Sequence, residues 1–230
     1  MDRLIYTAMT GASAAANRQS VLANNLANVS TNGFRAELST YRAVPVRGDG
    51  STTRVMALEA TPGFSDLPGA PQRTGRSMDA MTTGNSWFGV QGLDGTEAYT
   101  RNGSFEVDAE GTLKTNTGLT VLNDNGGPIA VPTGAEVTLG NDGTVTAKVG
   151  NQRPTGIGRL KLATPTADDP LNNDETARLH VGVLEGSNVN VIEAMVGMIQ
   201  TARQFEAQTK LMQTAEQDDR SAAQLLGMQG

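Results

Sequence analysis

A long helical pattern in the last quarter of the chain constrains its fold more than any other segment. The pattern follows Leu184 and opens with Gly186-Ser187-Asn188, residue types that turn a chain and cap a helix. Apolar side chains then recur at alternating spacings of four and three, with one gap at Thr209. This is the heptad-like period of about 3.5 residues typical of a helix packed along another helix. These apolar positions are Val191, Met195, Met198, Ala202, Phe205 and Met212. Such an amphipathic helix needs a partner that covers its apolar side.

The other long helical pattern covers residues 3–28, and we expect it to supply this partner. Its heptad-like positions hold Leu4, Ala8, Gly11, Ala15, Leu22, Leu26 and Val29. Small side chains dominate this segment, and they allow two helices to approach closely. The sequence therefore predicts an α+β fold. Long N- and C-terminal helices are expected to pair as a coiled-coil-like stalk, with an inserted, mainly β central domain.

Four segments are expected along the chain: an N-terminal helix over residues 1–34, an extended arm or linker over 35–84, a β-rich central domain with a return strand over 85–183, and a C-terminal helix over 184–230. The arm is rich in Thr, Ser, Gly and Pro, and Gly48-Asp49-Gly50-Ser51 reads as a flexible break in it. Two interpretations of the arm stay open: a plain surface loop, or a segment that lies on neighbouring subunits.

The central domain is expected to be a compact β body because turn signals recur at short intervals. Examples are Asp94-Gly95, Asn102-Gly103 and Asp142-Gly143. Strands are predicted between the turns at residues 97–100, 104–107, 119–122 and 144–147, with a final strand around 179–183. Trp87 and Phe88 are the expected core residues.

Composition excludes several classes of function. A net charge of −6 provides no basic surface that would neutralise nucleic-acid phosphates, so no nucleic acid is expected as a partner. No apolar run reaches the roughly 18 residues of a membrane span, so no membrane insertion is expected. The first residues imitate a signal peptide, but Asp2 cancels the charge of Arg3, and the helical pattern runs through the supposed cleavage site. A cleaved signal peptide is therefore not expected.

Catalytic chemistry was sought in the sequence and not found. There is one His, His180, and no Cys, so no nucleophile–His–acid set, thiolate site or zinc motif can be assembled. Asp168, Asp169 and Asp174 are close in sequence but lack the Gly and terminal Glu of an EF-hand loop. We therefore expect no catalytic residue, no cofactor site and no metal site, and the protein is not expected to be an enzyme.

Both ends of the chain carry motifs that are specific in sequence. The first predicted helix ends in Asn24-Asn25-Leu26-Ala27-Asn28-Val29-Ser30-Thr31-Asn32-Gly33-Phe34. The three asparagines are interpreted either as a fraying helix end or as a polar ladder that fixes register at a packed interface. This segment resembles the N-terminal signature of the bacterial flagellar rod and hook proteins, and 184–190 with 198–206 resembles their C-terminal signature. The opening MDRLIYTAMTG and the run YRAVPV are most similar to the proximal-rod members of that family.

The resemblance implies a non-enzymatic subunit of the flagellar basal-body rod, in its proximal part, that polymerises through its terminal helices as part of a torque-transmitting drive shaft. It implies as partners other copies of the chain, other flagellar rod proteins and the flagellar type III export apparatus. It implies a periplasmic location in the basal body, reached without a cleaved signal peptide. Two alternatives stay open: a distal rod or hook subunit of the same family, and a secreted β-domain adhesin with a coiled-coil stalk.

Periodicity and resemblance together predict a set of subunit-interface residues, for each of which a contact within the subunit is the alternative. In the N-terminal segment these residues are Leu4, Ala8, Ala15, Leu22, Asn24, Asn25, Leu26, Asn28, Gly33 and Phe34. In the C-terminal segment they are Val191, Met195, Met198, Ala202, Phe205 and Met212.

Overall fold

A computed structural model of the chain describes residues 2–45, 55–59, 63–165 and 172–227. The predicted flexible break at 48–51 and the acidic pair at 168–169 lie outside the described residues. The chain forms two compact units. The helix unit comprises Met1–Val29, Ala36–Ser65 and Val189–Gly230, and the β unit comprises Ser30–Arg35 and Asp66–Asn188.

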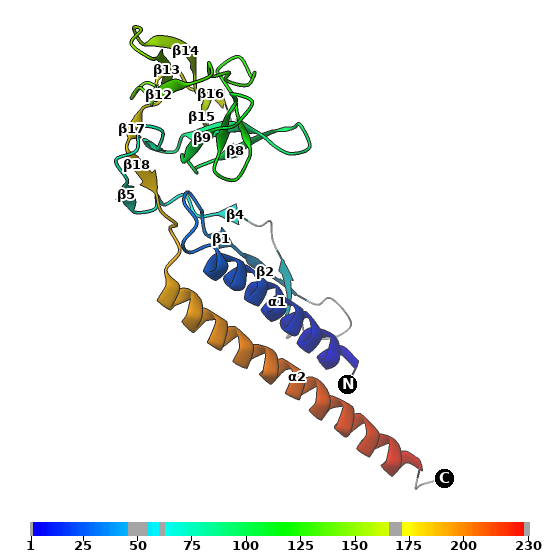
Figure 1. The fold of residues 1–230 in the computed structure, drawn as a ribbon. Coiled ribbons are helices and arrows are strands. Elements are labelled where there is room, and N and C mark those ends of the chain that lie inside the picture. The colour runs from blue at the N-terminus through cyan, green and yellow to red at the C-terminus, as the bar shows by residue number, and fades with distance from the viewer. Residues whose placement is uncertain (1, 46–54, 60–62, 166–171, 228–230) are drawn as a thin grey trace. The chain divides into compact units, whose positions relative to one another are not determined.

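The helix unit consists of two helices and two short strand pairs. Its elements are α1 (Asp2–Ala27), β1 (Glu37–Leu38), β2 (Tyr41–Pro45), β3 (Val55–Glu59), β4 (Gly63–Phe64) and α2 (Val191–Gly227). Strands β2 and β3 form an antiparallel pair, and β1 pairs with β4. Helix α1 packs against both α2 and β3, and the hydroxyl of Tyr41 on β2 donates a hydrogen bond of 2.9 Å to the carbonyl of Ala14. The two helices run side by side in Figure 1.

Helix α2 begins at Val191, just after the predicted cap segment Gly186-Ser187-Asn188, and its cap is Asn190. The side-chain oxygen of Asn190 accepts hydrogen bonds from the backbone N–H groups of Ile192 and Glu193, at 3.1 and 3.3 Å. An asparagine in this position satisfies donors of the first turn that have no partner within the helix. The acidic Glu193 in the same turn also suits the positive end of the helix dipole.

The β unit is built from short antiparallel strands joined by tight turns (Figure 1). Its elements are β5 (Pro71–Arg73), β6 (Ala80–Thr82), β7 (Trp87–Gln91), β8 (Glu97–Thr100), β9 (Phe105–Val107), β10 (Leu113–Thr115), β11 (Thr120–Val121), β12 (Ala135–Leu139), β13 (Thr144–Val149), β14 (Thr155–Arg159), β15 (Leu162–Thr164), β16 (Asn172–Asn173), β17 (Leu179–Val181) and β18 (Val183–Glu185). The largest sheet has the order β16-β15-β7-β11-β10-β9, with β8 on the other edge of β7, and a second sheet has the order β12-β13-β14. Strands are thus found in each segment for which turn spacing predicts one.

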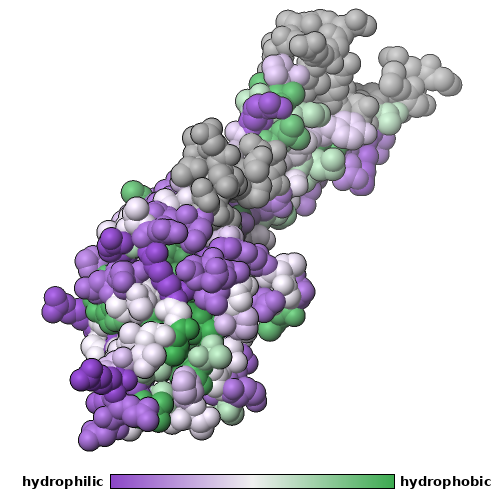
Figure 2. All heavy atoms as spheres, turned by 90° about the horizontal axis from the view of Figure 1, so that it is seen from above, coloured by the Kyte–Doolittle hydropathy of each residue, from purple (hydrophilic) through white to green (hydrophobic). Residues whose placement is uncertain are grey.

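One hydrophobic core lies between these sheets. Phe88 on β7 and Phe105 on β9 are fully buried, and their rings meet edge to face with centroids 5.1 Å apart. Aliphatic side chains from β10, β12, β13 and β15 complete the core. The face of the β unit seen in Figure 2 is mainly hydrophilic, with hydrophobic patches between the polar side chains. Phe88 is a core residue, as predicted, whereas Trp87 is half-buried.

Three turns of the β unit are closed by an Asp-x-Thr motif. In each of them, one aspartate oxygen accepts hydrogen bonds from the backbone N–H of the threonine two residues later, and its carboxylate also accepts one from the hydroxyl of that threonine. These bonds favour the ionised form, so the pKa of each aspartate lies below its usual range. The turns lie at residues 94–96, 142–144 and 174–176.

We expect Thr176→Val to raise the pKa of Asp174, because the hydroxyl of Thr176 is the largest cause that lowers it. A lowered pKa in the folded state stabilises the fold above the unfolded pKa of about 3.9, and that stabilisation is lost as pH falls through the folded pKa. Wild type should therefore be more stable than Thr176→Val at pH 7, and the difference should shrink below about pH 4. Carbon NMR titration of the carboxyl and urea unfolding at both pH values measure these effects.

The exposed Thr133, in a different loop, supplies the matched control Thr133→Val. This control should leave the pKa of Asp174 at its wild-type value. An unchanged pKa of Asp174 in Thr176→Val would contradict the role of the hydroxyl.

The predicted coiled-coil-like stalk is wrong. In the part of the chain that the structure describes, there is one N-terminal and one C-terminal helix with a mainly β region between them, and no long paired coiled coil. Two apolar heptad positions of α2 are not buried by α1: Met195 is 49% and Phe205 39% exposed. The physical reason is that α1 is covered partly by the β2–β3 pair, and that α1 and α2 meet through small side chains rather than through interlocking large ones.

Candidate assembly surface

Small residues recur on the two helices of the helix unit. Buried alanines are Ala8, Ala12 and Ala15 on α1 and Ala194 and Ala215 on α2. Glycine also brings the helices close at two points. A Cβ on Gly11 would lie 3.0 Å from Cδ of Gln208, and a Cβ on Gly197 would lie 3.2 Å from Cδ1 of Leu22. At both points the helices approach closely because glycine has no side chain.

A stripe of large apolar side chains lies on α2 away from this contact. Ile192, Met195, Val196 and Ile199 are 75%, 49%, 47% and 56% exposed. Their spacing of i, i+3, i+4 and i+7 places them on one side of the helix. Ala194, which is buried, lies on the other side, because it is two residues from both Ile192 and Val196. We call these four residues the α2 ridge. Its exposure indicates an interaction surface, since soluble chains rarely leave such a group of side chains in water.

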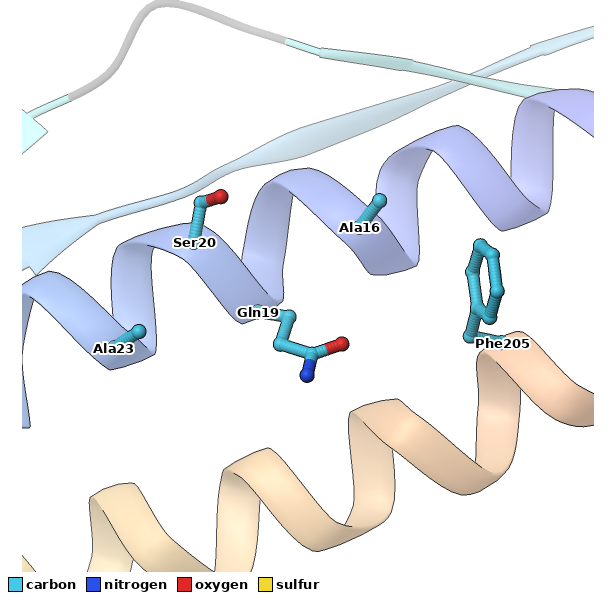
Figure 3. A pocket seen from close by; sticks show the side chains of 5 residues that line it. All are labelled: Ala16, Gln19, Ser20, Ala23 and Phe205. Atoms are coloured by element: carbon cyan, nitrogen blue, oxygen red, sulfur yellow. The ribbon is translucent and has the colours of Figure 1, made fainter.

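The side of α1 next to α2 carries a groove of about 340 Å³. It is lined by Ala16, Gln19, Ser20 and Ala23 of α1 and by Phe205 of α2 (Figure 3). The four α1 residues also follow the spacing i, i+3, i+4 and i+7, so they form one stripe along the helix. We call this site the α1 groove. In Figure 3, Phe205 closes one end of it, and Gln19 extends into the space between the two helices.

The asparagines of the first helix bind the strand that follows it. The side chain of Asn25 donates to the carbonyl of Glu37 at 3.0 Å and accepts from the N–H of Glu37 at 2.8 Å, as a neighbouring strand would. Asn24 donates to the carboxylate of Glu37 at 3.1 Å, and Asn28 donates to the side chain and the carbonyl of Asn24. Of the two interpretations of these asparagines, a polar network describes this arrangement, and the contacts lie within the helix unit.

The structure does not bring the predicted interface residues together on one surface. Gly33 and Phe34 belong to the β unit, Asn28 directly follows α1, and the others lie on α1 and α2. Those that are buried within the subunit are Ala8, Ala15 and Asn25, whereas Asn24, Met195 and Phe205 are exposed. Those that are half-buried are Leu22, Leu26, Asn28, Gly33, Phe34, Val191, Met198, Ala202 and Met212. The side chain of Leu4 lies outside the described residues. An intermolecular contact at any of these positions stays a prediction.

The heptad pattern missed three residues of the α2 ridge: Ile192, Val196 and Ile199. Their signal was in the sequence as the spacing i, i+3, i+4 and i+7, which is typical of a helix face that packs against another surface. Met195 belongs to both patterns. Each of the three missed residues is at least 47% exposed, which agrees with a face that points away from the α1 contact.

Three charged side chains form a buried ionic cluster in the β unit. Arg35, Arg101 and Glu185 are at most 4% exposed. One carboxylate oxygen of Glu185 lies 2.8 Å from Nη2 of Arg35, and the other lies 3.6 Å from Nη1 of Arg101. Glu185 also accepts the backbone N–H of Gly69 at 3.0 Å. Burial lowers the pKa of Arg101 to about 10, although Glu185 opposes this shift, so Arg101 stays charged at pH 7.

Arg101 also binds the segment that connects β6 to β7. It donates to the carbonyl of Gly84 at 2.8 Å and to the hydroxyl of Thr82, and its guanidinium lies 5.2 Å from the centre of the Trp87 ring. The tryptophan therefore has one face occupied by a cation of its own chain.

Neither metal nor membrane chemistry finds support in the part of the chain that the structure describes. These residues contain no group of three or more His, Asp or Glu arranged to hold a metal ion. They contain no helix that is long and apolar enough to cross a membrane.

Comparison with known proteins matches the regions that carry the α2 ridge and the α1 groove. Residues 5–35 match the family model described as flagella basal body rod protein, and residues 180–225 match the C-terminal model of the flagellar basal body rod FlgEFG proteins. Residues 81–147 match the D1 domain of flagellar hook protein FlgE/F/G. The flagellar basal-body rod protein FlgF of Escherichia coli (strain K12) is 43% identical over 252 aligned residues, covering 99% of this chain and 100% of the relative. The chain belongs to the FlgF family of flagellar basal-body rod proteins.

Other members of the family support the same assignment. FlgF of Salmonella typhimurium is 40% identical over 99% of this chain and 100% of the relative. The rod protein FlgG of Buchnera aphidicola from Schizaphis graminum is 31% identical over 96% of this chain and 98% of the relative. The matched segments of the FlgF-family chain contain the α1 groove and the α2 ridge, and the D1 match covers the strands from β7 to β12.

Proposed function

We propose that this chain is a non-enzymatic structural subunit of the proximal rod in the bacterial flagellar basal body. Its terminal helices pack against other copies of the chain and against other rod proteins. The observation that carries the proposal is the α2 ridge, a stripe of large apolar side chains left in water by the chain's own fold. Exposed apolar surface of this kind is stabilised by burial against a partner, by about 25 cal/mol per Å² of area removed from water.

The proposal includes a route and a place. The protein is exported through the flagellar type III apparatus without removal of a signal peptide, and it acts in the periplasmic part of the basal body. Support comes from the first helix: Ala8, Ala12 and Ala15 are buried in the fold. A cleavage after Ala16 would remove all three of these buried residues from α1.

Two alternatives are weaker. A distal-rod or hook role fits the family as well, but the full-length identities of 43% and 40% with FlgF of Escherichia coli and of Salmonella typhimurium favour the FlgF assignment. A carbohydrate-binding adhesin would need exposed aromatic rings. In this β unit Phe88 is fully buried, and Trp87 is half-buried with the guanidinium of Arg101 over its ring.

The test is an Ile199→Asp variant, which we expect to fold and to fail in assembly. Ile199 is 56% exposed, so a charge there is solvated in the free chain and costs little. In an assembled rod the same carboxylate would be buried without a partner, which is strongly unfavourable. The measurement is motility, with rod assembly seen by electron microscopy of basal bodies, in cells that lack their own copy of the protein.

Gln204→Asp is the matched control, because it places the same charge on an exposed residue of α2 that lies on a different face of the helix. We expect this control to restore motility, and circular dichroism should show the same helix content for both variants. Normal motility with Ile199→Asp would contradict an assembly role for the α2 ridge.

A further inference from the structure

The α2 ridge and the α1 groove have matching dimensions. The ridge runs from Ile192 to Ile199 and the groove from Ala16 to Ala23, so each covers two helical turns, or about 10 Å of helix axis. Both are formed by rows of residues four apart along a helix. Rows of this kind interdigitate when two helices pack ridge into groove.

Their side chains are complementary in size. The ridge presents two isoleucines, a methionine and a valine, each about half exposed or more. The groove presents alanines and a serine on α1, with Phe205 at its edge, so it has room for larger side chains (Figure 3). The chain cannot bring them together by itself, because the ridge lies on the side of α2 that faces away from its own α1.

Both surfaces are also free of charge. Arg18 is the one charged residue between Leu4 and Phe34, and it lies two residues from both Ala16 and Ser20, which places it on another side of α1. Within the ridge segment Glu193 is the one charged residue. It lies three residues before Val196, so it flanks the stripe, and its exposed carboxylate can stay in water at the edge of the contact. Burying these two surfaces together would therefore leave no charge without water.

We propose that the α2 ridge of one copy of this chain lies in the α1 groove of a second copy. This inference rests on the proposed role as an assembling rod subunit and specifies the contact. We assign a second copy as the occupant because each chain carries both the α2 ridge and the α1 groove, and the two cannot meet within one chain. Such a contact is heterologous: each copy offers a free ridge on one side and a free groove on the other, so the contact propagates.

Disulfide trapping tests this contact, because the natural chain has no cysteine. A Ser20→Cys chain is mixed with an Ile199→Cys chain under mild oxidation, and products are separated without reductant. The control mixes Ser20→Cys with Gln204→Cys, an exposed position five residues further on α2 and on a different face. We expect at least about tenfold more mixed dimer from the 20–199 pair, because a disulfide needs Cβ atoms about 3.8 Å apart.

A chain that carries both Ser20→Cys and Ile199→Cys distinguishes the geometry of the contact. A heterologous contact gives a ladder of dimers, trimers and larger species, which supports the proposal. Disulfides between two Ile199→Cys chains alone would show ridge-to-ridge pairing and would overturn it. Equal yields from the 199 and 204 positions, or no dimer at all, would overturn it as well.

A motility assay distinguishes the contact from the rod role. The cells carry, as their single copy of the protein, the chain with both Ser20→Cys and Ile199→Cys. Motile cells without a 20–199 disulfide would leave the rod role intact and overturn the contact. A strong 20–199 disulfide in a chain that never restores motility would support the contact and count against the rod role.

Discussion

Replacing Glu185 by Gln is expected to lower the free energy of unfolding of the β unit by about 3–5 kcal/mol. The carboxylate lies between two buried arginines, at 2.8 Å from Arg35 and 3.6 Å from Arg101. Gln keeps the size of the side chain but removes its charge, so two like charges remain in the interior, with the exposed Asp66 as a weaker carboxylate partner of Arg101. Urea unfolding followed by the fluorescence of the single tryptophan, Trp87, reports on the same unit.

Glu136→Gln is the control for this prediction, because Glu136 is an exposed glutamate on β12 of the same unit. Its substitution should change the unfolding free energy by no more than about 0.5 kcal/mol. If Glu185→Gln were as mild as this control, the two arginines would have to be neutralised or solvated in some other way, and the cluster would not hold the unit together.

Gly103→Ala is expected to destabilise the β unit by about 3 kcal/mol or more, although it adds a single methyl group. A Cβ at Gly103 would overlap the carbonyl oxygen of Ala80 and would lie 3.0 Å from Cε2 of Phe88. The backbone of Gly103 is hydrogen-bonded to strand β6, because the N–H of Ala80 donates to the carbonyl of Gly103 at 2.9 Å. Strand β6 would have to move, and the core around Phe88 with it.

Gly156→Ala provides the comparison for the extra methyl group. The neighbour of a Cβ at Gly156 is a methyl carbon of Thr144 at 4.0 Å, an ordinary contact, so we expect a change within about 1 kcal/mol. The measurement is again urea unfolding followed through Trp87. Comparable losses in the two variants would mean that the close approach at Gly103 can relax.

The sequence predicted the local structure of this chain well, because local chemistry determines it. Asp-Gly and Asn-Gly pairs marked turns, the segments between them are strands, and the cap at Asn188 was expected only two residues before the Asn190 that caps α2. The prediction of a coiled-coil-like stalk was wrong because a period of about 3.5 residues indicates an apolar helix face but does not identify what covers that face. In this fold the β2–β3 pair covers part of α1, and a hairpin of that kind leaves no helical period.

The candidate site was harder to predict than the fold. Two apolar patterns overlap on α2 and share Met195, and periodicity does not distinguish the face that packs within the chain from the face that meets a neighbour. The ionic cluster was also missed, because Arg35, Arg101 and Glu185 are far apart in sequence and each looks like an ordinary surface charge. A charged residue that is at most 4% exposed is identified by tertiary structure alone.

The division of the chain between its two units determines the order in which they can fold as it leaves an export channel or a ribosome. The β unit is complete once Asn188 has emerged, whereas the helix unit needs Val189–Gly230 as well. Helix α1 emerges first, and α2, against which it packs, emerges last. Contacts between segments so far apart in sequence form slowly. During that interval its uncharged face is open to any passing apolar surface. The first helix is therefore the part of the chain for which a dedicated chaperone or immediate capture by the growing rod would matter most.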